Sequence, residues 1–223
     1  MFKYIFFDLD GTLTDSSEGI TKCAKLALEH FGINGYELSD LTSFIGPPLR
    51  DSFPKYGVPA DKVEEAIEVF RGRYNVVGKF ENKPYEGIPE LLNMLMTNGF
   101  RLFVATSKPE ITAKQIMDKF DLTKYFEVVC GATMDGSRDS KESVIRYLLD
   151  TINAESAGEL SKEDILKSVI MIGDTEFDVV GAMAFGINTI GVSWGFGSAE
   201  DMLNAGAISI VDTMDDLYKK ISE

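Results

Sequence analysis

The sequence predicts an α/β fold with a doubly wound parallel sheet and an inserted all-helical domain. Three observations lead to this prediction. Short apolar runs recur along the chain and alternate with helical patterns, as expected for strands buried on both faces of a parallel sheet. One stretch, residues 15–83, interrupts this alternation with helical patterns alone. The chain of 223 residues is also long enough for a core domain with a smaller insertion.

Strands and helices are predicted in alternation on both sides of the interruption. The apolar runs that predict strands lie at residues 4–7, 101–105, 169–172 and 189–192, with weaker candidates at 127–130 and 207–211. The predicted helices cover residues 88–98, 109–120, 140–153 and 176–185. Gly99 and Gly186 follow two of these helices, where glycine commonly ends a helix. Alternating strand and helix favours a doubly wound α/β domain.

The interrupting stretch contains helical patterns and no convincing strand. Apolar residues between 17 and 31 recur at the spacing of one helix face, and residues 47–56 and 60–77 also have helical patterns. Pro84 and Gly87 mark the return to the alternating pattern. We therefore expect a core domain of residues 1–14 and 84–223, with a helical domain of residues 15–83 inserted after the first strand.

The charge of the chain is strongly acidic. There are 22 Lys and Arg residues and 36 Asp and Glu residues, which gives a net charge of −14. No basic patch is visible, so we expect no nucleic-acid polymer as a partner. No apolar stretch approaches the ~20 residues of a membrane span, and the first apolar run meets Asp8 too early for a signal peptide. These features predict a cytoplasmic protein that does not bind a membrane.

Several other classes of site are excluded by residues that are absent. Cys23 and Cys130 stand outside any CxxC pattern and are predicted to be free buried thiols. His30 is the single histidine, which excludes a multi-histidine zinc site. Residues 191–195 match G-x-S-x-G, but no histidine follows them, so a strand-end turn is predicted. Residues 135–146 lack the glycine and glutamate of a calcium loop, and no P-loop is present.

Polar residues follow three of the predicted strands. Asp8 and Asp10 follow the first strand, Thr106 and Ser107 follow the second, and Asp174 follows the run at 169–172. Each motif alone could be an ordinary turn or helix cap. However, ligands of open parallel sheets bind beyond the carboxyl ends of the strands. The joint occurrence of these motifs at strand ends therefore predicts one shared site.

The residue types in this site fit phosphoryl transfer through an aspartyl-phosphate. The carboxylate of Asp8 can attack phosphorus and divide a difficult hydrolysis into two easier steps. Because two anions must then meet, a divalent cation is needed, and Mg²⁺ prefers the oxygen ligands that Asp8, Asp174 and a carbonyl near Asp10 can supply. Lys141, at the start of the helix at 140–153, could stabilise charge on Asp8 and bind the transferring phosphoryl oxygens.

The remaining polar groups of these motifs are candidates for binding phosphate and moving protons. Hydroxyl and backbone N–H groups around Thr106 and Ser107 can hold phosphate oxygens, and Gly11 and Thr12 are expected to take part. Gly11 allows a tight turn that lets a second carboxylate, Asp10, face the site. Asp10 can then protonate the leaving oxygen and later deprotonate the attacking water.

Residues 8–13, Asp-Leu-Asp-Gly-Thr-Leu, resemble the first signature of haloacid dehalogenase-type phosphatases. Thr106, Lys141 and the segment 173–178 resemble the other three signatures, in the same order and over essentially the whole chain. The resemblance implies a Rossmann-like core with a helical cap. It implies Asp8 as the nucleophile and Asp10 as the acid and base. By the same resemblance, Thr106 binds phosphate and Lys141 stabilises charge.

The resemblance also implies a magnesium site. Asp8, the Asp10 carbonyl and Asp174 would bind Mg²⁺, while Asp178 would orient a water molecule or Lys141. A phosphomutase of the β-phosphoglucomutase type would share every one of these residues and is therefore an alternative. A catalytically inactive phosphate-binding regulatory module is a second alternative. A dehalogenase needs neither a second carboxylate at Asp10 nor a magnesium site.

Finer features point to one group within the superfamily. Residues 44–50, 106–109 and 135–138 resemble the phosphoglycolate phosphatase-like group, and within it a bacterial branch described as 5′-nucleotidases. This resemblance implies a small phosphorylated metabolite as substrate, such as a nucleoside 5′-monophosphate or a phosphoglycolate-like compound. Arg50 is a candidate for contacting that substrate from the helical domain, and a surface arginine near a helix start is the alternative. The sequence leaves monomer and dimer open.

Overall fold

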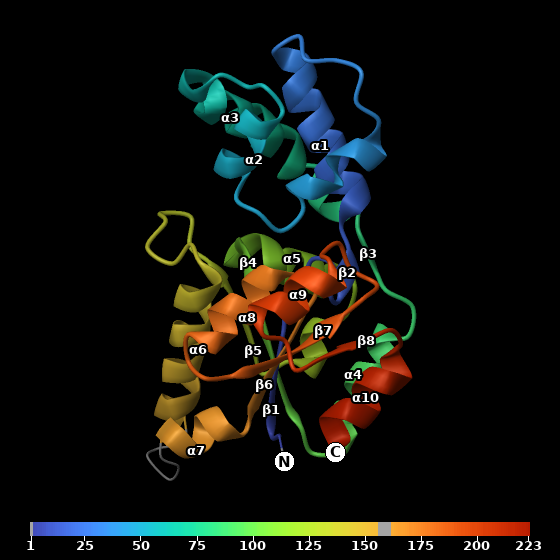
Figure 1. Ribbon diagram of the computed structural model, residues 1–223, viewed down its shortest axis with the longest axis vertical. Helices are drawn as coiled ribbons and strands as arrows, with labels where there is room; N and C mark the ends of the chain where they lie inside the picture. Colours follow the sequence, from blue (N-terminus) through green and yellow to red (C-terminus); the bar gives the residue numbers. More distant parts are fainter. Residues whose placement is uncertain (1, 156–161) are drawn as a thin grey trace. The chain divides into compact units, whose positions relative to one another are not determined.

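The computed structural model describes residues 2–155 and 162–223 and divides the chain into two compact units (Figure 1). The first unit contains Met1–Leu13 and Pro84–Glu223, and the second contains Thr14–Lys83. At their boundary in the sequence, the short strands β2 (Thr14–Asp15) and β3 (Lys83–Pro84) pair as a two-stranded sheet. The larger unit therefore draws its first strand from one side of the insertion and the rest of its sheet from the other.

A six-stranded sheet forms the centre of the larger unit, in the order β5-β4-β1-β6-β7-β8, and all its pairings are parallel. The predicted α/β fold with a doubly wound parallel sheet is therefore confirmed. The strands are β1 (Tyr4–Phe7), β4 (Arg101–Pro109), β5 (Val128–Ala132), β6 (Val169–Gly173), β7 (Asn188–Val192) and β8 (Ser209–Val211).

Helices cover both faces of this sheet, because its strands are apolar on both sides. Ile5 and Phe7 of β1 belong to one buried cluster, which also includes residues of α4, α5 and α10. Tyr4 and Phe6 belong to a second cluster, with residues of α6, α7 and α8. The helices are α4 (Ile88–Thr97), α5 (Glu110–Lys119), α6 (Lys141–Glu155), α7 (Lys162–Lys167), α8 (Glu176–Met183), α9 (Ala199–Ala205) and α10 (Met214–Ser222).

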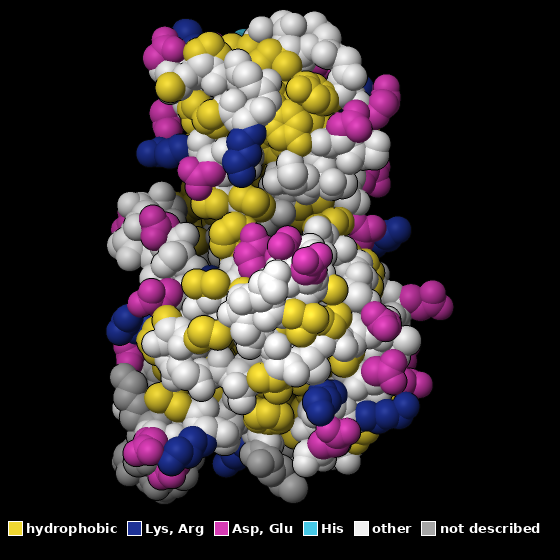
Figure 2. All heavy atoms as spheres, in the orientation of Figure 1, with side chains coloured by type: hydrophobic (Ala, Val, Ile, Leu, Met, Phe, Trp, Pro, Cys, Tyr) yellow, Lys and Arg dark blue, Asp and Glu magenta, His cyan; other side chains and the backbone are white. Residues whose placement is uncertain are grey.

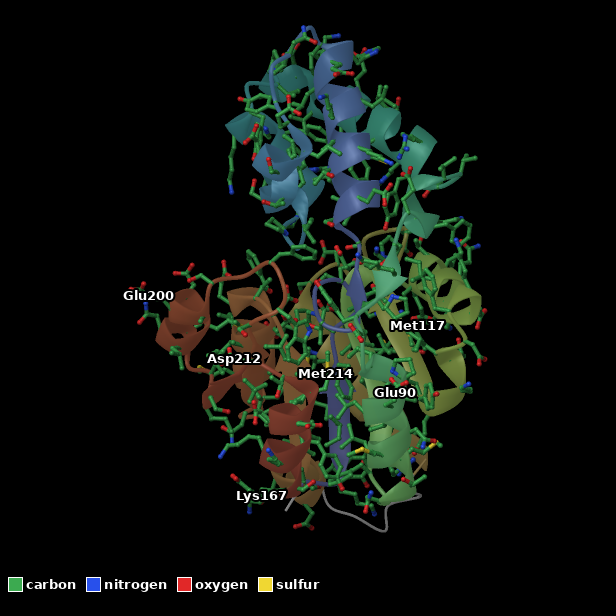
Figure 3. All side chains as sticks on the ribbon, turned by 90° about the vertical axis from the view of Figure 1, so that its right-hand side faces the viewer. Glu90, Met117, Lys167, Glu200, Asp212 and Met214 are labelled. Carbon is green, nitrogen blue, oxygen red and sulfur yellow. The ribbon has the colours of Figure 1, made fainter. Side chains whose placement is uncertain are left out.

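The helices of the first cluster lie on the face turned to the viewer in Figure 3. There Glu90 marks α4, Met117 marks α5 and Met214 marks α10. Met117 is fully buried in the cluster, and Met214 packs against it partly buried. A 3₁₀ turn, η4 (Thr123–Tyr125), leads from α5 toward β5. Alternate residues of the central strands therefore pack against opposite layers of helices.

The smaller unit is built from helices and 3₁₀ turns around aromatic side chains. Phe44, Phe53, Phe70 and Tyr74 form a chain of ring contacts inside it. The first helix approaches the last turn closely at Gly19, where an added Cβ would lie 2.0 Å from a backbone oxygen. Its elements are α1 (Ser17–His30), η1 (Leu38–Phe44), α2 (Leu49–Lys55), η2 (Ala60–Lys62), α3 (Val63–Tyr74) and η3 (Gly78–Phe80).

Several elements differ from their predicted bounds. The strand predicted at 101–105 continues to Pro109, with a register shift between Ala105 and Pro109 where it pairs with β5. The helix predicted at 47–56 begins only at Leu49, because Pro48 is extended with ψ of 135°. Helices α9 and α10 were not predicted from the apolar pattern.

Two features of the structure bear on the predicted partners: the distribution of surface charge and the length of the helices. On the face shown in Figure 2, Lys and Arg side chains lie scattered among acidic ones rather than gathered in a patch. Within residues 2–155 and 162–223, no helix is long and apolar enough to cross a membrane. The expected absence of nucleic-acid and membrane partners stays a prediction.

Candidate active site

The polar motifs meet at the centre of the sheet, because β1 lies between β4 and β6. Asp8 follows β1, and its backbone N–H donates to the carbonyl of Ile172 on β6 at 2.9 Å. Asp174 follows β6, and Thr106 lies near the carboxyl end of β4. The three motifs therefore stand on adjacent strands at the same edge. This edge is the switch point from which the chain winds in both directions, where such folds bind ligands.

Lys141 is the buried cation of this site. It is the first residue of α6, and its Nζ lies 2.8 Å from Asp8 Oδ1 and 2.6 Å from Asp178 Oδ1. The ammonium also donates to the carbonyl of Ala105 at 2.9 Å. Burial lowers the pKa of Lys141, but the charges of Asp178 and Asp8 raise it by more, so the net pKa lies above its usual value. Lys141 is therefore a permanent positive charge beside Asp8.

Three carboxylates lie close together at this site. Oxygens of Asp8, Asp174 and Asp178 lie within 4.8 Å of one another, and all three residues are buried. Burial, with the charges of Asp178 and Asp8, raises the pKa of Asp174 well above its ordinary value. Burial also raises the pKa of Asp178, although Lys141 opposes this. Lys141 pairs with two of these three carboxylates, Asp8 and Asp178.

The cluster has the chemistry of a divalent cation site. Its donors are carboxylate oxygens, which Mg²⁺ and Ca²⁺ prefer. Oδ1 of Asp8 and Oδ1 of Asp178 are buried without a well-aligned hydrogen-bond donor, although both lie close to Lys141 Nζ. Oδ2 of Asp178 accepts from the backbone N–H and the hydroxyl of Thr175, both at 3.1 Å. Both oxygens of Asp178 therefore already face groups of the protein, Thr175 on one side and Lys141 on the other.

Asp174 is held in place by two donors. The hydroxyl of Thr12 donates to its Oδ1 at 3.1 Å, and the backbone N–H of Phe196 donates to its Oδ2 at 2.9 Å. The Thr12 hydroxyl, predicted to bind phosphate, is thus engaged by a carboxylate. Gly11 has φ of +85°, and an added Cβ there would lie 2.1 Å from Asp174 Oδ2. The turn after β1 therefore requires glycine for both its backbone conformation and its closeness to Asp174.

The segment after β7 is a part of the site that the sequence did not reveal. Residues 191–195 were predicted to be a strand-end turn, and β7 does end at Val192. The same turn closes over Asp174, since an added Cβ on Gly195 would lie 2.2 Å from Asp174 Cβ. Trp194 Nε1 also donates to the carbonyl of Thr12 at 3.1 Å. The glycines on either side of Phe196 were the sequence signal for the close approach of this turn to Asp174.

Asp10, the predicted acid and base, forms an ion pair with Lys108. Lys108 Nζ lies 2.8 Å from Asp10 Oδ1 and 2.7 Å from Oδ2. Thr106 is buried, and its Oγ1 accepts from the backbone N–H of Lys108 at 3.2 Å, while Ser107 is half-buried. Lys108 lies within the motif at residues 106–109, and the sequence predicts no role for it.

The other predicted residues lie outside this cluster. Arg50 is in the first turn of α2, exposed, and its Nη2 lies 2.6 Å from Glu64 Oε1 of α3. Its contact with substrate stays a prediction. Cys23 and Cys130 are buried free thiols, as the sequence suggested. His30 ends α1 and lies 3.1 Å from Glu65 Oε1.

The raised carboxyl pKa values predict an unusual pH dependence for the metal-free protein. As the pH falls toward the ordinary Asp pKa of about 4, the folded state binds protons at Asp174 and Asp178 before the unfolded chain does. Stability should therefore rise as the pH falls from neutrality through this window. Glu81 opposes this trend only at a pH below the ordinary pKa of a glutamate, because the hydrogen bond from Arg73 lowers the pKa of Glu81 to about 2.

Urea unfolding with EDTA at neutral and mildly acidic pH tests this trend. Asp174→Asn should flatten it, whereas the exposed Asp121→Asn should retain it. Saturating Mg²⁺ should also flatten it in the wild type, because a bound cation favours the ionised carboxylates. Steady loss of stability on acidification of the metal-free wild type would contradict the prediction.

Comparison with known proteins places this geometry in a family. The family model of haloacid dehalogenase-like hydrolases matches residues 5–192. A 5′-nucleotidase of Pseudomonas aeruginosa is 44% identical over 202 residues, 90% of this chain and 87% of the relative. A phosphoglycolate phosphatase of Aquifex aeolicus is 31% identical over 195 residues, 87% of this chain and 86% of the relative.

Two further matches cover nearly the whole chain. Tyrosine-protein kinase PtkA of Mycobacterium tuberculosis is 38% identical over 221 residues, 98% of this chain and 72% of the relative. The crystal structure of a predicted phosphatase from Clostridium acetobutylicum superimposes with a TM-score of 0.89 and 45% identity, covering 100% of this chain and 99% of that one.

These matches confirm the family that the motifs predicted, and with it the prediction of a phosphatase that acts on phosphorylated substrates. The matched range includes Asp8, Lys141 and Asp174, so it covers the carboxylate cluster and most of the sheet. The chain belongs to the haloacid dehalogenase-like hydrolase family.

Proposed function

We propose that this protein is a Mg²⁺-dependent phosphomonoester hydrolase that works through an aspartyl-phosphate on Asp8. One observation carries the proposal: the Asp8 carboxylate lies at the end of the central strand, beside the buried ammonium of Lys141 and within the carboxylate cluster. A carboxylate in this position is oriented and lies next to a fixed cation. These are the properties of a nucleophile that must approach an anionic phosphate.

The reaction divides into two displacements at phosphorus. In the first, an Asp8 oxygen forms a bond to phosphorus while the bond to the ester oxygen breaks, and Asp10 gives its proton to the departing alcohol. In the second, water attacks the same phosphorus, Asp10 takes a proton from it, and the bond to Asp8 breaks to release inorganic phosphate. Lys141 neutralises charge on Asp8 and on the transferring group in both steps.

Asp8, Asp174 and the backbone carbonyl of Asp10 would hold the Mg²⁺ ion, and Asp178 would hold Lys141 in place. The ion would supply positive charge between the two anions, which lowers the cost of their approach. Thr106 and Ser107, with the backbone around Gly11, would bind the remaining phosphate oxygens. The contacts of Asp178 support the role proposed for it, because one of its oxygens accepts from Thr175 and the other faces Lys141.

The proposed substrate is a small phosphorylated metabolite, a nucleoside 5′-monophosphate or a phosphoglycolate-like compound. The names of the Pseudomonas aeruginosa and Aquifex aeolicus relatives support these two classes. Every phosphomonoester presents the same phosphoryl group to the core site. Discrimination must therefore come from groups that contact the rest of the substrate. We propose that these groups lie within residues 15–83 and include Arg50.

A screen of phosphate release tests the proposed function. Purified protein should hydrolyse p-nitrophenyl phosphate with Mg²⁺, lose activity with EDTA and regain it when Mg²⁺ is restored. Nucleoside 5′-monophosphates or phosphoglycolate should exceed sugar phosphates in kcat/KM. EDTA-resistant hydrolysis would contradict the metal dependence. Conversion of a phosphate ester to its isomer without phosphate release would indicate a phosphomutase, and binding without turnover would indicate a regulatory module.

A further inference from the structure

We propose that Lys108 is a positioning residue for the acid and base Asp10, an inference that rests on the proposed function. The ammonium of Lys108 lies within hydrogen-bond distance of both carboxylate oxygens of Asp10, at 2.8 and 2.7 Å. Both side chains are largely buried, with 5% of Lys108 and 13% of Asp10 exposed. A single ammonium close to both oxygens restricts the rotation of the carboxylate as well as its position.

The backbone of Lys108 is itself held firmly. Its N–H donates to Thr106 Oγ1, and it lies in the register shift of β4, between Ala105 and Pro109. Its carbonyl packs against Gly131 of β5, where an added Cβ would lie only 2.5 Å away. Lys108 therefore joins β4 to the turn after β1, across 98 positions in the sequence.

Positioning matters for Asp10 because its two proton transfers take place on different atoms. The carboxyl group must reach the ester oxygen in the first step and a water molecule in the second. A carboxylate that is free to rotate spends less time within reach of either atom. Lys108 restricts the Asp10 side chain without contacting the reacting phosphorus. Its loss should therefore weaken the steps that depend on Asp10 and leave the attack by Asp8 unchanged.

Lys108→Met tests this role, because methionine retains much of the side-chain length without the charge. For an alkyl phosphate from the screen, whose leaving group needs a proton, kcat/KM should fall about 10²-fold. The leaving group of p-nitrophenyl phosphate does not need a proton. For this substrate kcat and KM should fall together, so kcat/KM should change by less than about threefold. Lys108→Arg should recover most of the lost activity. The exposed Lys114→Met should behave as wild type.

A double-mutant cycle with Asp10→Asn separates positioning from a general structural defect. If Lys108 acts through Asp10, the double variant should be no slower than Asp10→Asn alone. Additive losses, or equal losses on both substrates, would overturn the proposal, as would full activity of Lys108→Met. These failures are distinct from failure of the proposed function, in which the wild type itself would show no Mg²⁺-dependent phosphate release.

Discussion

Asp8→Asn is expected to lower kcat for p-nitrophenyl phosphate by about 10⁴-fold or more, which corresponds to a loss of about 5 kcal/mol in transition-state stabilisation. The amide has nearly the same shape as the carboxylate but cannot form the bond to phosphorus. The fold should persist, because the backbone N–H of residue 8 still pairs with Ile172 and the buried cluster loses one negative charge. Steady-state phosphate release in saturating Mg²⁺ measures the effect.

The control for this variant is Asp121→Asn, an exposed change of the same chemistry, which should retain wild-type activity. Thermal unfolding of both proteins distinguishes lost chemistry from lost structure. If Asp8→Asn is folded and retains activity within about tenfold of wild type, Asp8 is not the nucleophile.

Lys141→Met is expected to reduce both activity and stability. The variant removes the buried cation that lies within 2.8 Å of Asp8 and 2.6 Å of Asp178. Loss of a preorganised charge at the reacting group should lower kcat by about 10³-fold. Removal of one partner from a buried ion pair leaves the others uncompensated, so unfolding free energy should fall by about 3–5 kcal/mol. Phosphate release and urea unfolding in EDTA measure the two effects.

The exposed Lys167→Met provides the matched control, because its ion pair with Glu163 lies at the surface. It should change stability by less than about 1 kcal/mol. Saturating Mg²⁺ should restore part of the stability of Lys141→Met, since a bound cation compensates the same carboxylates, but should not restore its activity. Loss of stability in both lysine variants to the same extent would argue against a special role for Lys141.

The sequence could predict the sheet and the catalytic cluster because both depend on local patterns. Central strands are buried on both faces, so their apolar runs stand out, and parallel strands bring their carboxyl ends to one edge. Asp8, Thr106 and Asp174 could be assigned to one site for this reason. Lys141 could be proposed because it begins a predicted helix and resembles the third signature of the family.

The missed features depend on contacts between distant residues or on weak signals. The contact of Lys108 with Asp10 and that of Phe196 with Asp174 join separate strand ends, and no periodic pattern reports them. Helices α9 and α10 are short, although each has a cap that the sequence shows. Ser198 and Thr213 accept from backbone N–H groups three residues later, where an acidic residue stands. These caps are the sequence signal from which both helices could be predicted.

The central claim is that the reaction passes through a phosphoryl group on Asp8, and trapping that group tests it most directly. In Asp10→Asn, p-nitrophenyl phosphate should still phosphorylate the enzyme, while hydrolysis of the intermediate slows because water loses its base. Acid quench, proteolysis and mass spectrometry should then find close to one phosphoryl group per chain, on Asp8 and labile to hydroxylamine. Turnover with no trapped intermediate, or a phosphoryl group on a serine, threonine or another aspartate, would contradict the account.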